Sequence, residues 1–470
     1  MNNRKHSRRH CTNTRPAPRS VLMIAALTLC NAAAAADGDL DPAFGVGGFG
    51  VAGVTGAAFI LPPKLAVQPD GKILYCSELN TGGGTGSDFL IMRFNANGSL
   101  DTSFNFDGKV TVDFSAHNEG CNAVAVQPDG KIVAVGASEP SGSFNFDFAI
   151  ARLNADGTLD ASFGAGTGKT TVAFDLGDTN SDSGNAVALQ PDGKIVVAGW
   201  ADTAAHGDDF AVVRLLPDGT RDTAFNVTGR VTIAFDLPAS GSQIDEADAI
   251  AIDEAGNIIV GGLADAGPSG GSDFAVARLL PNGMLDHNFD ADGRATFAFD
   301  LGASNSDQAY DMIRQRDGKI VLVGDADTGS GSTSNLDTAI ARLLPDGSPD
   351  PDFGIGGKVL VPYDLVASGT DVAYGVVEDS AGRLVVVGGA ISSTGARPVT
   401  ARLLANGTLD EGFGVFGKQA YDVGGDASTF TGVTLQGTQI IAGGVVVVGT
   451  NQDDLVARLQ VDLIFANGFE

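Results

Sequence analysis

The sequence predicts an all-β fold, a seven-bladed β-propeller assembled from four-stranded repeats of about 61 residues. Three observations lead to this prediction. Glycine accounts for 65 of the 470 residues and lies among short runs of Val, Ile, Ala and Phe, which is typical of short strands joined by tight turns. One pattern recurs seven times along the chain. The last copy lacks a segment that the beginning of the repeat region supplies.

The repeat is most easily followed through one arginine and one phenylalanine. The arginine stands in runs such as Ala-Arg-Leu and recurs at Arg93, Arg152, Arg214, Arg278, Arg342, Arg402 and Arg458. The phenylalanine closes an "LDxxF" run and recurs at Phe44, Phe104, Phe163, Phe225, Phe289, Phe353 and Phe413. Each series has a mean spacing of about 61 residues. Seven copies fall within the range of about four to eight blades that propellers use.

Each repeat contains four strand-like runs. In the third copy they are Thr170–Phe174, Ala186–Gln190, Lys194–Ala198 and Phe210–Leu216. The turn Pro191-Asp192-Gly193 joins the second run to the third, because proline fixes the entry to a turn and glycine tolerates a positive φ. A single sheet of this size cannot bury both faces, whereas stacked repeats can.

The two ends of the repeat region fit the closure of a ring. The seventh copy ends at Arg458-Leu459 without the turn and "LDxxF" run that follow in other copies. Residues Asp37–Phe44 carry that missing piece with no repeat before it. An open solenoid would instead need a distinct polar cap at each end, so a closed propeller is favoured.

Residues 1–36 have the features of a secretory signal peptide. Six basic residues and no acidic one precede the apolar run Val21–Leu29, and small residues stand at Ala34 and Ala36. We therefore expect the protein to be exported, to the periplasm, the cell surface or the medium. The propeller is expected to span residues 37–463, with a short tail at 464–470.

The net charge of the chain limits the kinds of partner that it can bind. Once residues 1–36 are removed, 57 acidic and 23 basic side chains remain. Nucleic acid is excluded as the leading partner, because its phosphates would be repelled. No later stretch reaches the roughly 18 apolar residues of a membrane span. The partner is expected to be a protein or a glycan that the sequence does not identify, and the chain is expected to be a monomer.

The repeat also carries a family resemblance. The pattern "AvavqPDGKIvvaG…dfavaRLlpdGtLDxsFGxxGkv" resembles the delta-sixty repeat of bacterial secreted proteins, and the likeness extends over residues 37–460. The resemblance implies a β-propeller-type fold and no catalytic residues. Copies four to seven depart from it at the hairpin turn, as in Glu254-Ala255-Gly256.

Three motifs that could indicate a nucleotide or nucleophile site are better explained as repeat turns. Residues 164–170 lack the first glycine of a P-loop, and residues 45–50 match G-x-G-x-x-G. Residues 267–271 match G-x-S-x-G. All three precede a strand rather than the helix that each motif requires. The only histidines after residue 36 are His117, His206 and His287, so a zinc site is not indicated.

Calcium is the one metal for which the sequence offers candidate ligands. Oxygen-bearing side chains cluster in Asp/Asn-Gly segments at Asp290, Asp292, Asn105, Asp107, Asn154, Asp156 and Asp160. Asp-Gly and Asn-Gly are also common turn sequences, so a turn role is favoured and no cofactor is expected.

The repeated arginines and two cysteines are interpreted as structural. In several copies an aspartate follows the arginine by eight residues, as in Arg152 and Asp160, which indicates a repeated ion pair within or between blades. Cys76 and Cys121 remain after export into an oxidising compartment. A disulfide between them, from one repeat to the next, is a candidate.

Three classes of function remain open. The leading one is a non-catalytic exported propeller whose varied loops, such as 81–88 and 325–335, bind a protein, glycan or cell-surface partner. The second is a carbohydrate-active lyase or hydrolase that uses paired carboxylates. The third is a purely structural surface protein.

Overall fold

The computed structural model describes residues 36–461 apart from 54–63, 81–85, 116, 141, 143, 178, 205–206, 236–243, 266–270, 303–304, 331–334, 367–368 and 450. The proposed signal peptide, except Ala36, and the tail at 464–470 lie outside the described residues. No described segment forms a helix with the length and apolar character needed to cross a membrane.

The described residues form seven antiparallel sheets of four strands each. Blades 1 to 4 are β2 (Leu65–Val67), β3 (Ile73–Asn80), β4 (Ser87–Phe94), β5 (Lys109–Val112); β6 (Glu119–Val126), β7 (Ile132–Ser138), β8 (Asp147–Leu153), β9 (Lys169–Val172); β10 (Asp182–Leu189), β11 (Ile195–Thr203), β12 (Gly207–Leu215), β13 (Arg230–Ile233); and β14 (Asp245–Ile252), β15 (Ile258–Asp265), β16 (Ser272–Leu279), β17 (Arg294–Phe297). Blades 5 to 7 are β18 (Asp307–Arg314), β19 (Ile320–Asp327), β20 (Leu336–Leu343), β21 (Lys358–Val361); β22 (Asp371–Glu378), β23 (Leu384–Ser392), β24 (Gly395–Leu403), β25 (Lys418–Ala420); and β26 (Ala427–Gln436), β27 (Gln439–Val448), β28 (Asn451–Leu459), β1 (Phe49–Ala52).

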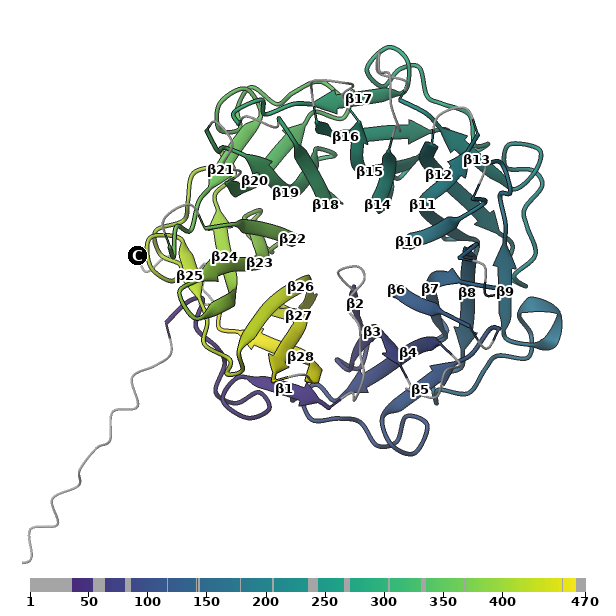
Figure 1. Ribbon diagram of the computed structural model, residues 1–470, viewed down its shortest axis with the longest axis horizontal. Coiled ribbons are helices and arrows are strands. Elements are labelled where there is room, and N and C mark those ends of the chain that lie inside the picture. The colour runs from purple at the N-terminus through teal and green to yellow at the C-terminus, as the bar shows by residue number, and fades with distance from the viewer. Residues whose placement is uncertain are drawn as a thin grey trace, which may run out of the picture. The chain divides into compact units, whose positions relative to one another are not determined.

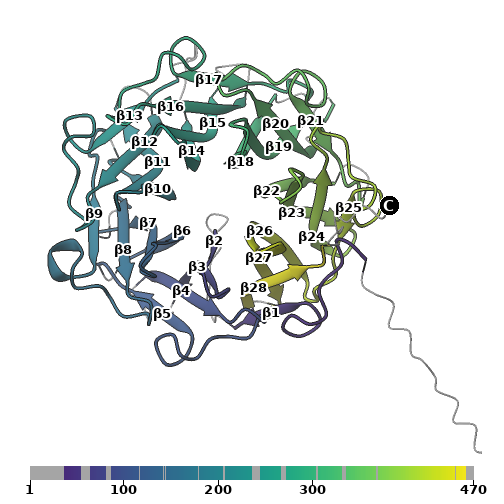
Figure 2. The same cartoon turned by 180° about the vertical axis from the view of Figure 1, so that it is seen from behind.

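The seven sheets are arranged as the blades of a ring around a central axis, and the region along this axis is called the channel below (Figure 1). The strands β2, β6, β10, β14, β18, β22 and β26 are innermost in the views from both faces (Figure 2). Each innermost strand also contacts the innermost strand of both neighbouring blades. The prediction of a seven-bladed β-propeller is therefore confirmed.

The chain closes the ring by pairing its two ends in blade 7. Strand β1 lies beside β28 in antiparallel register, with Phe49 opposite Ala457. Leu40 forms a further bridge to Leu459, and the Asp41 amide donates to the Arg458 carbonyl at 2.8 Å. This confirms the closure predicted from the complementary ends.

The structure also fixes which predicted runs share a blade. The first run of the third copy becomes β9, the outermost strand of the preceding blade, while the other three become β10 to β12 of blade 3. The innermost strand starts at Asp182, four residues before the predicted start, because a bulge at Asn185 allows the ladder to continue past it. The hairpin glycine Gly193 has φ of 83°, as the turn requires.

The hydrophobic core lies between neighbouring blades. One cluster combines Val135, Phe148 and Phe163 of blade 2 with Val197 and Val213 of blade 3, all fully buried. Because each sheet buries its two faces against different neighbours, removing one blade face exposes core on both sides of the gap.

The repeated arginine, aspartate and phenylalanine form one packing unit in every blade. The pairs are Arg93 with Asp101 and Phe104, Arg152 with Asp160 and Phe163, Arg214 with Asp222 and Phe225, Arg278 with Asp286 and Phe289, Arg342 with Asp350 and Phe353, Arg402 with Asp410 and Phe413, and Arg458 with Asp41 and Phe44. In blade 2, Arg152 lies 4.6 Å from the Phe163 ring centroid and also donates to the Pro217 carbonyl of blade 3. The unit therefore ties one blade to the next.

Charge on Asp160, the aspartate of this unit in blade 2, is strongly favoured. Burial opposes the charge on Asp160, but hydrogen bonds from Ser162, together with the Lys131 and Arg152 cations, hold the pKa of Asp160 well below its usual range. The arginine series is thus part of the scaffold, and its members are committed to ion pairs inside the blades.

A disulfide joins Cys76 of β3 to Cys121 of β6 and so links blade 1 to blade 2. The two residues are 45 apart in sequence, and both are almost completely buried.

The double substitution Cys76→Ala and Cys121→Ala is expected to lower the free energy of unfolding by about 2–4 kcal/mol, because the cross-link limits the unfolded chain. Urea unfolding followed by circular dichroism measures the loss. The same substitutions compared under reducing conditions provide the control, since the two proteins should then unfold at similar urea concentrations. Equal stability of the oxidised protein and the variant would contradict the prediction.

Candidate functional site

Six of the seven innermost strands carry a bulge at the same repeat position. The register shifts by one residue in β6, β10, β14, β18, β22 and β26. The extra residues are Asn122, Asn185, Asp248, Tyr310, Tyr374 and Thr431. A bulge re-aims a side chain out of the alternating pattern of its strand. One repeat position therefore places six different polar side chains on the strands around the channel.

Three of these bulge residues are joined by hydrogen bonds from blade to blade. Asn122 Nδ2 donates to the Gly184 carbonyl of blade 3 at 3.0 Å. Asn185 Nδ2 donates in turn to Asp248 Oδ1 of blade 4 at 2.9 Å and to the Ala247 carbonyl at 3.2 Å. The amides thus hold the Asp248 carboxyl in a fixed position.

Lys64 connects blade 1 to the far side of the ring. Its backbone amide donates to the Asn122 carbonyl of blade 2. Its ammonium lies 3.0 Å from Asp311 Oδ1 and donates to the Tyr310 carbonyl at 3.0 Å, both in blade 5. Asp311 Oδ2 also accepts from the Val376 amide of blade 6 at 3.0 Å. Because blades 1 and 5 are not neighbours, this ion pair spans the channel.

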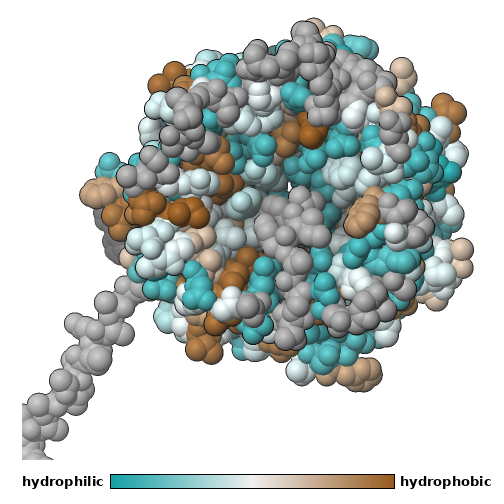
Figure 3. All heavy atoms as spheres, in the orientation of Figure 1, coloured by the Kyte–Doolittle hydropathy of each residue, from teal (hydrophilic) through white to brown (hydrophobic). Residues whose placement is uncertain are grey.

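A cavity of about 510 Å³ lies against these residues. Its polar lining includes Lys64, Asn122, Asn185, Glu246, Asp248 and Tyr310. Ile244 and Leu263 of blade 4 add an apolar part to the wall. The face shown in Figure 3 is largely hydrophilic, and its apolar residues lie in separate small groups. The cavity has the size and mixed lining of a small-molecule site.

The carboxyl groups of the cavity have unusual acidity. Burial raises the pKa of Asp248 to about 8, and the nearby Glu246 adds to this, while Lys64 and the hydrogen bond from Asn185 oppose it. Burial and the charge on Asp208 raise the pKa of Glu246 to about 7. Near neutral pH, Asp248 is therefore mostly protonated and can both donate and accept a hydrogen bond.

Tyr310 lines the same cavity as Asp248, and Tyr374 packs against Tyr310. The rings of Tyr310 and Tyr374 have centroids 5.3 Å apart, and Tyr310 donates from its hydroxyl to Gln308 Oε1 at 2.6 Å. Burial raises the pKa of Tyr374 to about 12, with the Asp325 carboxyl contributing. Both phenols remain protonated in the physiological range and can offer hydroxyl hydrogen bonds.

The calcium candidates from the sequence lie on turns away from the cavity. Asp156 accepts from the Thr158 amide, Asp107 from the Lys109 amide and Asp292 from the Arg294 amide. Asn105 and Asn154 donate from their side-chain amides within their own turns, to Lys109 and Thr158 respectively. Asp160 pairs with Arg152, and Asp290 has a left-handed backbone with φ of 41°. These contacts support a turn role, and calcium at these turns stays an untested prediction.

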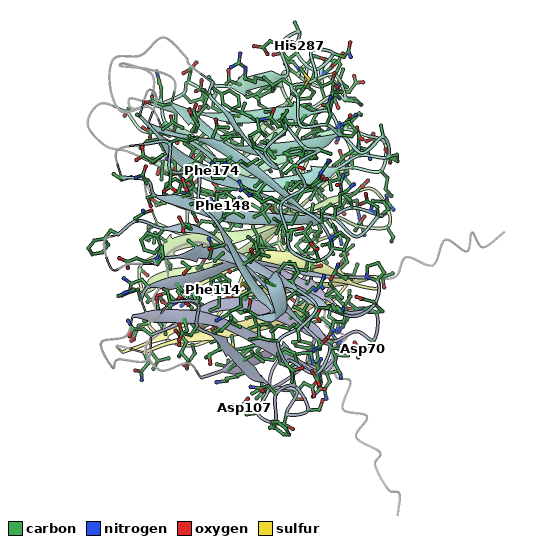
Figure 4. All side chains as sticks on the ribbon, turned by 90° about the vertical axis from the view of Figure 1, so that its right-hand side faces the viewer. Asp70, Asp107, Phe114, Phe148, Phe174 and His287 are labelled. Atoms are coloured by element: carbon green, nitrogen blue, oxygen red, sulfur yellow. A yellow bond between two sulfur atoms is a disulfide. The ribbon has the colours of Figure 1, made fainter. Side chains whose placement is uncertain are left out.

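The two described histidines, His117 and His287, are not among the residues that line the cavity. His287 is exposed and lies, like Asp107, at the periphery of the view in Figure 4. His117 lines a separate hollow with Asn118 and Glu139, and His206 lies outside the described residues.

One group of three carboxylates was missed by sequence reasoning. Among the described residues, Asp88, Asp113 and Glu119 hold oxygen atoms within 4.8 Å of one another. They lie where blade 1 meets blade 2, far apart in the repeat pattern, so no local motif indicates them.

The cavity residues were also missed, although the chain held a signal. Asn122, Asn185, Asp248 and Tyr310 each stand five residues before the Gln or Asp that enters the hairpin turn. The copies differ at this position more than at its apolar neighbours. Only the strand register shows that the position faces the channel.

Comparison with protein families supports the repeat assignment. Residues 68–104, 127–163, 190–225, 256–289, 315–353 and 382–413 each match a beta-propeller domain of unknown function, DUF5122. The six matches follow six of the seven repeats, so the chain carries the repeats of a β-propeller family whose function is not known.

Solved structures with a similar chain path include carbohydrate-active proteins. A polysaccharide lyase is 12% identical, with 85% of this chain and 90% of that chain covered and a TM-score of 0.47. An α-L-arabinofuranosidase from Fusarium graminearum is 11% identical, with 88% and 98% covered and a TM-score of 0.49. An ulvan lyase of family PL25 is 12% identical, with 88% and 96% covered and a TM-score of 0.48. No curated protein matches the chain.

Proposed function

We propose that this β-propeller is a glycan-binding protein whose central cavity holds one or two sugar units. The observation that carries the proposal is the wall built from one repeat position, where Asn122, Asn185, Asp248 and Tyr310 present amide, carboxyl and phenol groups to a single cavity. We also propose that the chain is exported and that its repeat is the delta-sixty repeat.

The chemistry of the wall suits a neutral ligand with many hydroxyl groups. Each sugar hydroxyl donates one hydrogen bond and accepts others, and amides and a protonated carboxyl group offer both functions. A strongly charged ligand fits less well. An anion would face a chain with a net charge of −28, and Lys64 already pairs with Asp311. Ile244 and Leu263 can contact the apolar face of a sugar ring.

Substitution of the cavity carboxyl group should weaken glycan binding. Asp248→Leu keeps a similar side-chain size but removes every hydrogen-bond donor and acceptor of the protonated carboxyl group. The affinity for the best glycan found on a microarray is expected to fall about tenfold or more, since a hydrogen bond to a buried group contributes about 1–2 kcal/mol. Isothermal titration calorimetry measures the change.

Glu411→Gln is the matched control, because Glu411 is exposed on an outer turn and outside the cavity lining. It should bind as the unaltered protein does. If the microarray retains no glycan, or if Asp248→Leu and Glu411→Gln bind equally well, the cavity is not the glycan site.

One observation favours the enzymatic alternative. Glu246 and Asp248 are two residues apart on β14, line the same cavity and influence each other's charge, with raised pKa values of about 7 and 8. Paired carboxyl groups with separate protonation states are the machinery of glycoside hydrolysis. Release of reducing ends from a polysaccharide panel, lost in Glu246→Gln, would favour hydrolysis over binding alone.

A further inference from the structure

The loop that precedes each outermost strand carries an exposed apolar side chain. This side chain stands two residues after the repeated phenylalanine, and it is apolar and exposed in all seven copies: Val46, Phe106, Ala165, Val227, Ala291, Ile355 and Val415. Phe106, between β4 and β5, has the largest side chain of the series and is 94% exposed. Its neighbour Asp107 lies at the edge of the molecule in Figure 4. The repeat therefore presents apolar side chains around the outer rim of the ring.

The loop that carries Phe106 is held at both ends by backbone hydrogen bonds. The Asn105 amide donates to the Asp156 carbonyl of blade 2 at 3.0 Å. The Gly108 amide donates to the Phe104 carbonyl at 2.7 Å. The Phe106 side chain is thus presented on a fixed loop, so a partner that buries it has little backbone freedom to remove.

Phenylalanine is an unfavourable residue at position 106 of the single chain. Phe106 has φ of 70° and Asn105 has φ of 48°, a left-handed conformation that glycine and asparagine adopt more readily than a bulky residue. The exposed ring also contributes no apolar burial to the stability of the fold. Glycine would suit the turn better, so a phenylalanine here points to a contact outside the chain.

An apolar groove of about 510 Å³ lies on the same rim, beside the outermost strand of blade 5. Its walls include Phe299, Leu301, Ile355 and Leu360, of which Leu301 and Ile355 are 54% and 89% exposed. An apolar cavity of about 150 Å³ is enough to bind benzene. The groove therefore has the size and the apolar lining that a phenylalanine ring requires.

The charges beside Phe106 and beside the groove are complementary. Phe106 is followed directly by Asp107, which is exposed. Lys358 lines the groove, where its ammonium donates to the Ala298 carbonyl and lies 5.5 Å from the Phe299 ring centroid. The chain has a net charge of −28, so most contacts between two copies are repulsive. A carboxylate that meets an ammonium favours this one relative orientation.

The Phe106 loop and the groove lie on opposite sides of the ring. Strand β5 follows the Phe106 loop, strand β21 lines the groove, and the two strands are at opposite edges in the views from both faces (Figure 1, Figure 2). A contact between two different surfaces of identical chains is heterologous. It leaves a free Phe106 at one end of the complex and a free groove at the other, so further copies can add.

We propose that Phe106 of one copy of this protein docks in the groove of a second copy, so that the propellers associate head to tail through their rims. The proposal revises the expectation of a monomer. A buried aromatic side chain covers about 150–250 Å², far less than a stable interface buries, so the association is weak and depends on concentration. The groove is separate from the channel cavity, and the proposal does not depend on the ligand of that cavity.

The test is sedimentation of the full chain over a range of concentrations. From about 10 µM to about 1 mM, the range of weak contacts, the mass should rise beyond that of a dimer. Phe106→Asp and Leu301→Glu should each abolish the rise. Both should melt as the unaltered protein does, because aspartate tolerates a left-handed backbone and Leu301 is already half exposed.

A mixture of these two variants distinguishes the head-to-tail contact from a symmetric one. Phe106→Asp keeps the groove and Leu301→Glu keeps the phenylalanine. An equimolar mixture should therefore form dimers and nothing larger, although each variant alone is a monomer. Phe106→Gly should also abolish the association while melting no lower than the unaltered protein, since glycine relieves the left-handed backbone.

Val227→Asp is the matched control, because Val227 has the same repeat position, is 85% exposed and has φ of 63°. It should associate as the unaltered protein does. The proposal is wrong if the unaltered protein stays monomeric at the highest concentration or stops at a dimer. It is also wrong if Val227→Asp loses as much association as Phe106→Asp, or if the mixture of Phe106→Asp and Leu301→Glu stays monomeric.

Discussion

Deletion of residues 36–52 is expected to turn the protein into an aggregating species that no longer unfolds cooperatively. The deletion removes β1 and leaves β28 as an unpaired outer edge of blade 7, and exposed strand edges promote association. It also removes Phe44, which is fully buried among Tyr75, Met92 and Phe94 of blade 1 and Val456 of blade 7. Both the edge and the interface between the first and last blades are therefore lost.

A single substitution in the same segment tests its contribution to stability without removing strand β1. Phe44→Ala should lower the free energy of unfolding by about 3–5 kcal/mol, the usual cost of removing a buried phenylalanine. Val46→Ala is the control, because Val46 is 83% exposed on the same segment and should change little. Urea unfolding measures both variants, and size-exclusion chromatography measures association of the deletion. If Phe44→Ala and Val46→Ala unfold at the same urea concentration, closure through this segment contributes no stability.

Most of the fold could be predicted because the same sequence pattern recurs in all seven blades. A recurring Arg-x₇-Asp-x₂-Phe spacing, as in Arg152, Asp160 and Phe163, averages out local irregularities and fixes both the repeat length and the number of blades. The complementary ends at Asp37–Phe44 and Arg458 could be recognised for the same reason. The assignment of strands to blades could not, because a run such as Thr170–Phe174 is equally suited to either neighbouring sheet and only tertiary pairing decides.

The sites could not be predicted because they depend on differences between copies and on contacts between blades. In the sequence, nothing distinguishes Asp248 from the other aspartates near turns. Only the bulge in β14 shows that its side chain faces the channel. Asp88 and Glu119 of the carboxylate group between blades 1 and 2 lie 31 residues apart, and no motif joins them. Sequence reasoning placed calcium candidates on Asp-Gly turns, where backbone amides already occupy the carboxylates, as Asp156 shows.

Arg402→Met is the substitution expected to be most harmful among the seven repeated arginines. Arg402 is only 1% exposed, and its guanidinium lies 2.5 Å from Asp37 Oδ2 and 2.8 Å from Asp410 Oδ2. Methionine fills a similar volume but leaves the buried Asp37 carboxylate and the partly buried Asp410 carboxylate facing an apolar side chain, although Asp410 keeps an ion pair with Arg383 at 3.3 Å. Removing one partner of a buried ion pair typically costs about 3–5 kcal/mol, and here the lost cation serves two anions.

The matched comparison is Arg278→Met, because Arg278 has the same repeat position, stacks on Phe289 and pairs with Asp286 but is 13% exposed at its side chain. Among the described residues, Asp286 alone lies within ion-pair distance of its guanidinium. Urea unfolding of both variants should give a much lower free energy of unfolding for Arg402→Met than for Arg278→Met.

Adding Asp37→Asn to Arg402→Met should recover part of the lost stability, since one buried charge is then removed. The double-mutant cycle gives the coupling energy between the two residues. Asp37 belongs to the segment that carries β1, so a large coupling means that the same N-terminal segment is held to blade 6 by charge and to blade 7 by strand pairing. If the two arginine variants are equally stable and Asp37→Asn restores nothing, the cost is one of packing alone and Asp37 does not anchor the ring.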